Sequence, residues 1–185
     1  MTVIAIQGTL GSYSEEAARQ ITGVSAAILE CPDFDSVFQA VAGDKADMAV
    51  VPVRNKIVGS IERPAELIEV YKMQVCGELK LPIEHILAGA AGSSIDDVSV
   101  VRSHIEALKQ CEKYLSEHPD WKLEHGMDTA GSLKMITKNN ETNTAAICGR
   151  RAAEIYGADI LASSIADEDD NWTVFQLVGK KETIK

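Results

Sequence analysis

Short apolar runs alternate along the chain with segments of helical hydrophobic spacing, and only short polar links separate them. An apolar run bounded by turn residues is typical of a buried strand, whereas apolar residues three and four positions apart are typical of a helix. Val3–Gln7, Thr144–Cys148 and Asp47–Val53, which stops at a proline, show the strand pattern, and Phe34–Ala42 shows the helical one. The alternation predicts an α/β fold with mostly parallel strand pairing.

Turn residues and helix-start signals divide the rest of the chain in the same way. Ser12 and Glu15, and again Ser103 and Glu106, have the spacing of a capping box at a helix start. No repeat, low-complexity segment or Pro/Gly/Ser-rich linker is present in the sequence, so two independent domains are not expected. The remaining expected strands are 73–79, 83–88, 98–101, 122–125, 159–163 and 172–178, and the remaining expected helices lie near 61–71, 103–115, 128–137 and 150–156.

The charge balance excludes some classes of partner. The chain has 185 residues and a formal net charge of -10, and binding to nucleic acid requires a basic face, so we expect no nucleic-acid partner. No apolar stretch is long enough to cross a bilayer, and the N-terminal residues resemble a first strand rather than a signal peptide. We therefore expect a cytoplasmic protein with no membrane partner.

The cysteines and histidines give no sign of a disulfide frame, a metal site or a cofactor. The four cysteines are widely spaced and form no Cys-x-x-Cys, so we expect reduced, mostly buried thiols. The four histidines form no ligand pair at metal-binding spacing. The cysteines are Cys31, Cys76, Cys111 and Cys148, and the histidines are His85, His104, His118 and His125.

Four expected strand ends run into polar loops that lead to helix starts: Gly8–Ser14, Arg54–Ser60, Ser103–Glu106 and Asp128–Ala130. Helix starts favour anions, and ligands of open α/β sheets bind beyond the carboxyl ends of the strands. The first loop lacks the spacing of a dinucleotide-binding or Walker motif. If the chain forms two facing lobes, we expect these loops to line one cleft for a small anion.

A fifth segment of interest, Ile165–Phe175, begins with a run of acidic residues and ends in a strand pattern. Alternation along that strand places Thr173 and Phe175 on one face and Val174 and Gln176 on the other. The Thr173 hydroxyl is then either a donor and acceptor in a site or an ordinary β-branched strand side chain.

These five segments, taken in order, resemble the catalytic domain of prephenate dehydratases over nearly the whole chain. Gly8–Ala18 resembles the family's Gly-Pro-x-Gly-Thr-Phe-Ser-x-x-Ala-Ala, and Pro52–Ser60 is similar to its Pro-Val-Glu-Asn-Ser-x-x-Gly-Ser. Ser103–Cys111 is similar to Ser-His-Pro-Gln-Ala-Leu-x-Gln-Cys, Asp128–Ala130 to a Thr-Ala helix start, and Asn171–Phe175 to Asn-x-Thr-Arg-Phe.

The resemblance implies a two-lobed fold of the type II periplasmic-binding-protein kind, with prephenate in the cleft between the lobes. It implies one catalytic domain over residues 1–185, with lobe one at about 1–77 plus 164–185 and lobe two at about 78–163. It also implies a homodimer. The sequence shows no regulatory ACT domain after the catalytic domain, so we expect no phenylalanine feedback of that kind.

The same resemblance implies roles for individual residues. It assigns Thr173, Asn55 and Glu106 to catalysis, with Thr173 and Asn55 orienting the ring hydroxyl. Each has an ordinary structural alternative: Asn55 as a turn residue and Glu106 as the capping partner of Ser103. Thr129 has the alternative of a helix cap, and Trp172 that of a packing residue. The implied substrate-binding residues are Ser12, Tyr13, Ser14, Arg54, Lys56, Ser103, His104, Thr129, Ala130, Trp172, Val174 and Phe175.

Departures from the family pattern bear on the reaction. Val174 replaces an arginine that resembles a carboxylate anchor, Glu106 replaces a glutamine, and Arg54 and Lys56 stand where the family has Glu and Ser. The Trp-Thr-Val-Phe stretch is similar to that of bacilysin-type prephenate decarboxylases, which do not aromatise the ring. We therefore expect such a decarboxylase first, a prephenate dehydratase as the alternative, and a non-catalytic anion-binding module as the third reading.

Overall fold

The computed structural model describes residues 2–23 and 25–181, which form two compact units. Unit 1 contains the residues up to Thr9, Tyr13–Ile83 and the residues from Asn171 onward, and unit 2 contains Leu10–Ser12 and Glu84–Asp170. The boundaries thus lie about six residues later in the sequence than the expected ones after 77 and 163. The reason is that strand β5 (Gln74–Pro82) pairs along its length with strand β11 (Trp172–Gly179), which keeps both strands in unit 1.

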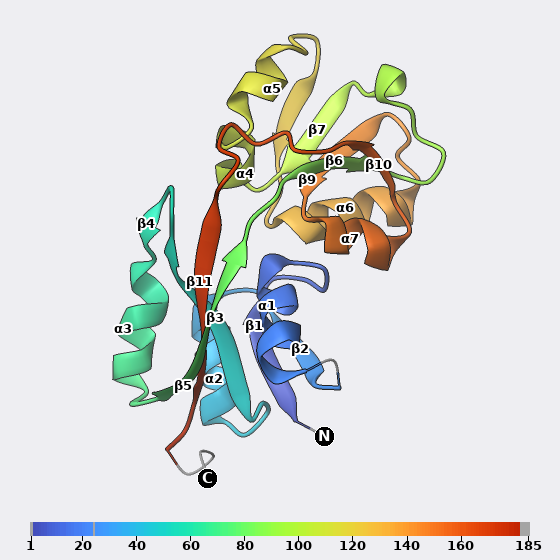
Figure 1. The fold of residues 1–185 in the computed structure, drawn as a ribbon. Coiled ribbons are helices and arrows are strands. Elements are labelled where there is room, and N and C mark those ends of the chain that lie inside the picture. Colours follow the sequence, from blue (N-terminus) through green and yellow to red (C-terminus); the bar gives the residue numbers. More distant parts are fainter. Residues whose placement is uncertain (1, 24, 182–185) are drawn as a thin grey trace. The chain divides into compact units, whose positions relative to one another are not determined.

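Unit 1 is built around a six-stranded sheet with the order β2-β1-β3-β11-β5, with β4 pairing β3 (Figure 1). Strands β1 and β2, and β1 and β3, pair in parallel, whereas β11 runs antiparallel between β3 and β5. Its other elements are β1 (Val3–Gln7), α1 (Tyr13–Thr22), β2 (Ala27–Cys31), α2 (Phe34–Ala42), β3 (Met48–Asn55), β4 (Gly59–Ser60) and α3 (Glu62–Val70).

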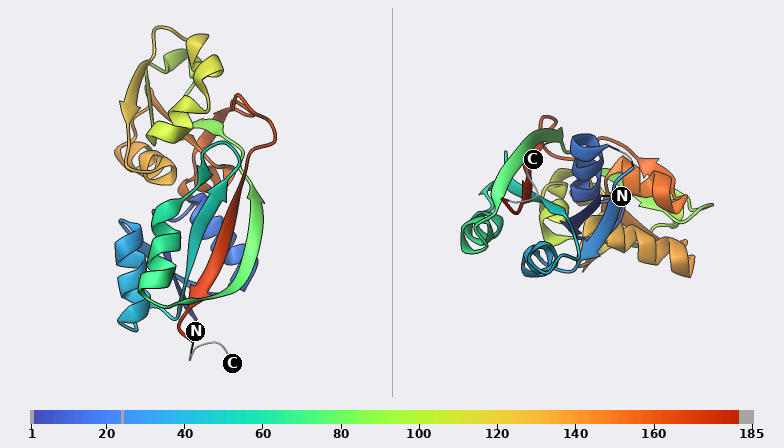
Figure 2. Two further views of the ribbon diagram at one scale, coloured as in Figure 1. Left: turned by 90° about the vertical axis from the view of Figure 1, so that its left-hand side faces the viewer. Right: turned by 90° about the horizontal axis from the view of Figure 1, so that it is seen from below.

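Alternation along the strands gives this sheet two apolar faces. Helix α1 covers one of them, and α2 and α3 cover the other (Figures 1 and 2). Ile4, Val50 and Phe175 point to the face that α1 covers, where Ala17 and Ala18 are fully buried. Ala5 and Val51 point to the opposite face and pack with residues of α2 and α3, including Phe38 and Leu67. Each strand of a sheet covered on both sides must be apolar on both sides, which explains the near-continuous apolar runs.

Unit 2 contains a five-stranded sheet with the order β10-β6-β9-β7-β8 and is also covered on both faces. One cluster joins α6 and α7 to Ala88 and Ala146, and another joins α4 and α5 to Leu87 and Ile147. Its elements are β6 (Ile86–Gly89), a 3-10 turn at Ile95–Asp97, β7 (Val100–Ser103), α4 (Ile105–Lys109), α5 (Glu112–Ser116), β8 (Lys122–His125), α6 (Thr129–Asn139), β9 (Thr144–Cys148), α7 (Arg150–Tyr156) and β10 (Asp159–Ala162).

The segment Leu10–Ser12 belongs to unit 2 although it follows a strand of unit 1. The Tyr156 hydroxyl of α7 donates to the Leu10 carbonyl oxygen at 2.6 Å. Gly11 has a φ of 86°, and a Cβ there would lie 2.8 Å from the Ala152 backbone. Only glycine therefore fits this turn, which passes directly over the start of α7.

The predicted α/β class is confirmed, but several of the details are wrong. Five of the nine strand pairings in the described chain are antiparallel, because β11 and β6 each lie antiparallel to both neighbours and the short β4 pairs antiparallel with β3. The expected helix 103–115 is two short helices that are interrupted at Cys111, and the expected strand 83–88 begins only at Ile86. Strand β2 was not predicted. No described helix is long and apolar enough to span a membrane, and the described residues contain no cluster suited to a metal ion.

Candidate functional site

Strand β3 does not stop at Val53, just after the proline, as the sequence suggests, but continues to Asn55. A β-bulge makes this possible: Phe175 pairs with Pro52, whereas Val174 pairs with Arg54, which leaves Val53 as the extra residue. A proline is tolerated at a bulge because the ladder is already interrupted there. One extra residue also reverses the side-chain alternation, so Asn55 points to the same face as its pairing partner Thr173.

Asn55 is the centre of a buried hydrogen-bond network in unit 1. Its side-chain NH2 donates to the Thr173 Oγ1 at 2.9 Å, to the Asn171 Oδ1 at 3.0 Å and to the Trp172 carbonyl oxygen at 3.0 Å. Its Oδ1 accepts from the backbone N–H groups of Ile57 at 2.9 Å and Val58 at 3.0 Å. The amide thus uses its full donor and acceptor capacity within the protein.

This network determines which hydrogen bonds the Thr173 hydroxyl can make. Thr173 is 7% exposed, and its oxygen already accepts a hydrogen bond from Asn55. Among the described residues no acceptor for the hydroxyl hydrogen is found. The Asn55 amide therefore holds the hydroxyl oxygen, and the hydroxyl hydrogen is left as a donor.

The opposite face of the same strands carries positive charge. Val174 pairs with Arg54 on one side and with Lys80 of β5 on the other, so the three side chains share one face with Trp172. The Arg54 guanidinium carbon lies 5.6 Å and the Lys80 Nζ lies 4.3 Å from the centre of the Trp172 ring. Sequence reasoning missed Lys80 because its position opposite Val174 is visible only from the strand register.

The helix start at Ser103–Glu106 in unit 2 differs from the expected capping box. The fully buried Ser103 hydroxyl donates to the Ile147 carbonyl oxygen at 2.6 Å. His104 is the N-cap instead, and its Nδ1 accepts from the Glu106 backbone N–H at 3.3 Å. The Glu106 carboxylate is exposed and pairs with Lys109 at 2.9 Å. The capping box is wrong because Ser103 still belongs to strand β7, where its side chain bonds to the neighbouring strand.

The remaining predicted residues occupy varied positions. Asp128, not Thr129, caps helix α6 by accepting from the Gly131 backbone N–H, and the Ala130 side chain is fully buried in the core. Ser14 is buried in the first turn of α1, and Phe175 is buried in the core of unit 1. Of the predicted set, unit 2 holds Ser12, Ser103, His104, Glu106, Thr129 and Ala130, and unit 1 holds Tyr13, Ser14, Arg54, Asn55, Lys56, Trp172, Thr173, Val174 and Phe175.

Comparison with known proteins decides the family. The family model described as prephenate dehydratase matches residues 4–183. The chain belongs to the prephenate dehydratase family.

Curated relatives and solved structures agree with this membership. The chain is 38% identical over 181 residues to "Arogenate dehydratase/prephenate dehydratase 2" of Arabidopsis thaliana, covering 98% of this chain and 47% of that protein. It is 36% identical to "Bifunctional chorismate mutase/prephenate dehydratase" of Neisseria gonorrhoeae, covering 97% and 50%. The structure of an Arthrobacter aurescens prephenate dehydratase in complex with L-Phe has a TM-score of 0.87 and 27% identity, covering 97% and 60%. The chain spans about half the length of these curated relatives.

The cysteines of this prephenate dehydratase family member are unsuited to nucleophilic chemistry. All four are free, and three are buried. Burial raises the pKa of the Cys148 thiol to about 12, and burial with the nearby charge of Asp167 raises the pKa of Cys111 to about 12. Burial also raises the pKa values of Cys31 and Cys76. A thiol needs a lowered pKa to react at neutral pH, so chemistry at the site falls to oxygen and nitrogen groups.

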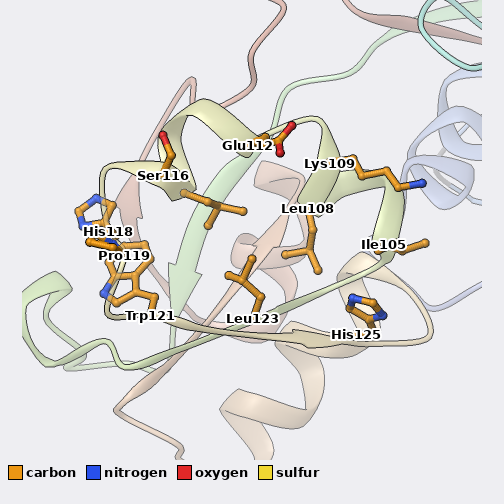
Figure 3. Close-up of a pocket in the computed structure, with 11 residues that line it drawn as sticks. Ile105, Leu108, Lys109, Glu112, Ser116, His118, Pro119, Trp121, Leu123 and His125 are labelled. Atoms are coloured by element: carbon orange, nitrogen blue, oxygen red, sulfur yellow. The ribbon is translucent and has the colours of Figure 1, made fainter.

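A pocket with a volume of about 410 Å³ lies in unit 2 between α4, α5 and β8 (Figure 3). Leu108, Leu123 and Trp121 supply much of its apolar lining, and His125 lies at one end. None of the residues predicted for the site lines this pocket. We therefore place the candidate site at the Asn55–Thr173 network and not here.

Proposed function

We propose that this chain is a lyase that decarboxylates and dehydrates prephenate to phenylpyruvate, or the corresponding amino compound arogenate to phenylalanine. The observation that carries the proposal is the Thr173 hydroxyl, which Asn55 holds through its oxygen while its hydrogen is left to donate. Such a donor suits the departure of the ring hydroxyl. We include arogenate as a possible substrate because the names of several relatives contain it.

The reaction balances with a single proton donor at the ring hydroxyl. The bond between the ring and its carboxylate breaks, and the electron pair stays with the ring as carbon dioxide leaves. The bond between the ring and its hydroxyl oxygen breaks at the same time, and that oxygen departs as water with one proton taken up from solution. Thr173 donates a hydrogen bond to the departing oxygen in this scheme, since electrostatic and proton-donor assistance is most effective where charge develops.

Strand register bears on whether the ring hydroxyl leaves or stays. Val174 points away from the face of Thr173 and lies between Arg54 and Lys80. The arginine that the family pattern has at position 174 would lie on the face of Val174, away from Thr173. Its absence therefore leaves the Asn55–Thr173 network intact. The retained network and the dehydratase names of the relatives together support dehydration over the decarboxylase expected from the sequence.

A non-aromatising prephenate decarboxylase is the second candidate. Val174 in place of arginine and Glu106 in place of glutamine support it. In that reaction carbon dioxide leaves, the ring carbon framework takes up a proton and the hydroxyl stays. An anion-binding module without turnover is the third candidate.

One assay separates the three. The protein is incubated with prephenate and, separately, with arogenate, while carbon dioxide release is measured and the product is identified by mass and ultraviolet absorbance. Phenylpyruvate or phenylalanine formed well above the uncatalysed rate supports the proposal. Carbon dioxide with a product that retains the hydroxyl identifies the decarboxylase, and saturable binding without carbon dioxide release identifies the binding module.

A homodimer and a cytoplasmic location also belong to the proposal. The family resemblance supports the dimer, and four free cysteines support a reducing compartment. Light scattering on the purified protein tests the oligomeric state: a mass of about one chain would contradict the dimer.

A further inference from the structure

Strand β8 is the last strand in the sheet of unit 2, so one side of its backbone faces away from that sheet. The Lys122 N–H donates to the Ser99 carbonyl oxygen at 2.9 Å, and the Gly126 N–H donates to a carbonyl oxygen of β7 at 2.8 Å. Backbone groups of successive residues in a strand point to alternate sides, so the N–H and C=O groups of Leu123 and His125 point outward. An edge with outward-facing backbone groups is a template for a further strand.

The two edges of this sheet differ in regularity. At the other edge, the pairing of β10 with β6 is irregular between Ile160 and Ala162. Such an irregularity bends an edge strand and hinders pairing with another chain. Strand β8 instead pairs with β7 in unbroken register along its whole length. It therefore presents the regular edge of unit 2.

Leu123 places apolar surface beside this edge. Its side chain points from β8 toward Leu108 of α4 and lines the pocket of unit 2, yet it is 46% exposed (Figure 3). His125 lines the same pocket and lies on the same face of the strand. A further strand along β8 would cover the exposed part of Leu123, and burial of apolar surface is favourable.

The charges of β8 favour one register for pairing with a second copy of this chain. In a two-fold symmetric antiparallel pair the axis must pass through a residue, because an axis between residues would set outward-facing backbone groups opposite inward-facing ones. An axis through Glu124 would set two carboxylates opposite each other, which is unfavourable. An axis through Leu123 sets Lys122 of each copy opposite Glu124 of the other. It also brings the outward N–H and C=O groups of the two Leu123 residues together.

We propose that β8 pairs antiparallel with β8 of a second copy, with Leu123 opposite Leu123 and Lys122 opposite Glu124. This joins the two five-stranded sheets into one continuous sheet, with main-chain hydrogen bonds across the interface. Within one copy, Lys122 Nζ lies 3.0 Å from Glu124 Oε1, and Arg102 pairs with the same carboxylate at 2.9 Å. Arg102 thus holds the carboxylate that meets Lys122 of the second copy. The inference rests on the homodimer proposed above and assigns the surface that forms it.

The first test is a cross-link through Leu123→Cys. It is made together with Cys76→Ser, because Cys76 is exposed and the other three cysteines are buried. Directly opposite residues of an antiparallel pair have Cα atoms about 5.5 Å apart, a distance that a disulfide spans. Under mild oxidation most Leu123→Cys chains should run as disulfide-linked dimers on a non-reducing gel. Val75→Cys in the same background should stay monomeric on that gel, since Val75 is a similarly exposed apolar residue of an edge strand in unit 1.

The second test reads the charge pairing. Lys122→Glu sets carboxylates opposite each other on both sides of the axis, so the dimer Kd from sedimentation equilibrium should rise by about tenfold or more. The exchange of both charges, Lys122→Glu with Glu124→Lys, restores opposite charges across the interface and should recover most of that loss. Lys45→Glu makes the same change of charge at an exposed position of unit 1 and should leave the Kd within about twofold of the parent value.

The outcomes separate this inference from the proposals it rests on. A parent protein that is a dimer by light scattering, with no Leu123→Cys cross-link and no effect of Lys122→Glu, dimerises elsewhere, which overturns the inference and leaves the homodimer standing. A parent that is monomeric at every concentration measured overturns both, whereas the product assay with prephenate still decides the reaction. Should Leu123→Cys not fold, Lys122→Glu alone decides, because the Lys122 side chain is exposed.

Discussion

The Asn55–Thr173 network and the Ser103–Glu106 helix start come from equally polar sequence segments, but the structure uses them differently. Asn55 joins residues 116 to 118 positions away through its side chain and leaves a hydroxyl hydrogen free to donate. The Ser103 hydroxyl donates its hydrogen bond to the Ile147 carbonyl oxygen, and the Glu106 carboxylate pairs with Lys109 on the surface. The first segment orients a donor, whereas the second stabilises its own unit.

The two segments differ in whether a hydrogen-bond donor is left without a partner inside the protein. In the first segment every hydrogen-bonding group of Asn55 is used, and the remaining donor belongs to Thr173. In the second, the buried Ser103 donates its only hydroxyl hydrogen, so it has no further hydrogen to offer a ligand. A polar residue at a strand end therefore indicates a site only after its partners inside the protein are known.

The largest expected effect is on turnover when the Thr173 hydroxyl is removed. Thr173→Val keeps the shape of the side chain but removes the donor, so kcat should fall about 10²–10⁴-fold, the usual range for loss of a proton-transfer group. Thr173→Ser retains the donor and should keep most of the activity. Product formation from prephenate is the measurement, with Thr137→Val on helix α6 as the control for a threonine outside the network. A Thr173→Val variant as active as Thr173→Ser would remove the hydroxyl from the mechanism.

The second effect is on the stability of the network. Asn55→Ala removes the donor and acceptor groups that join β3, the following turn and β11, and it leaves buried polar groups without partners. We expect the free energy of unfolding to fall by about 2–4 kcal/mol, measured by urea titration. Asn139→Ala, which removes an exposed hydrogen bond to the Glu141 carboxylate, should cost less than about 0.5 kcal/mol. Equal costs for the two variants would contradict a central role for Asn55.

Sequence patterns predicted the elements well where local rules decide, and less well where partners are distant. The expected strands 122–125 and 144–148 and the helix 150–156 have the observed bounds, because hydrophobic spacing and caps are local signals. The same rules ended this strand at Val53, because no local signal indicates the bulge opposite Val174 and Phe175. For that reason Asn55 was predicted in a loop, and Lys80 was not predicted at all.

The third effect tests whether Ser103 serves only the fold. Ser103→Ala leaves the Ile147 carbonyl oxygen without this buried donor, so the free energy of unfolding should fall by about 1–2 kcal/mol. Ser116→Ala removes a similar bond, to the Lys113 carbonyl oxygen, at an exposed position and should cost less than about 0.5 kcal/mol. Denaturant titration compares the two, and KM for prephenate in Ser103→Ala should stay close to that of the parent. A large rise in KM with unchanged stability would return Ser103 to the substrate-binding residues.

The smallest effect concerns a buried histidine of unit 2. His85 is 3% exposed, and burial lowers its pKa, although the contact between its Nε2 and the Gln110 Oε1 at 2.9 Å opposes that shift. In the unfolded chain the His85 imidazole therefore takes up a proton near pH 6.5, whereas in the folded chain it is still neutral at that pH. Stability should be complete above that pH and fall as the pH decreases toward the folded pKa, by at most about 1.4 kcal/mol per pH unit for one proton.

Comparison with His85→Gln isolates this contribution, because acidic groups that titrate in both proteins cancel in the difference. The difference in unfolding free energy between the two proteins should shrink by up to about 1 kcal/mol between pH 7 and pH 5.5. A His85→Gln difference that stays constant with pH would mean that His85 takes up its proton without unfolding. The interior of unit 2 around His85 would then accept a positive charge. Its difference from the Asn55–Thr173 network would then lie only in the arrangement of the hydrogen bonds.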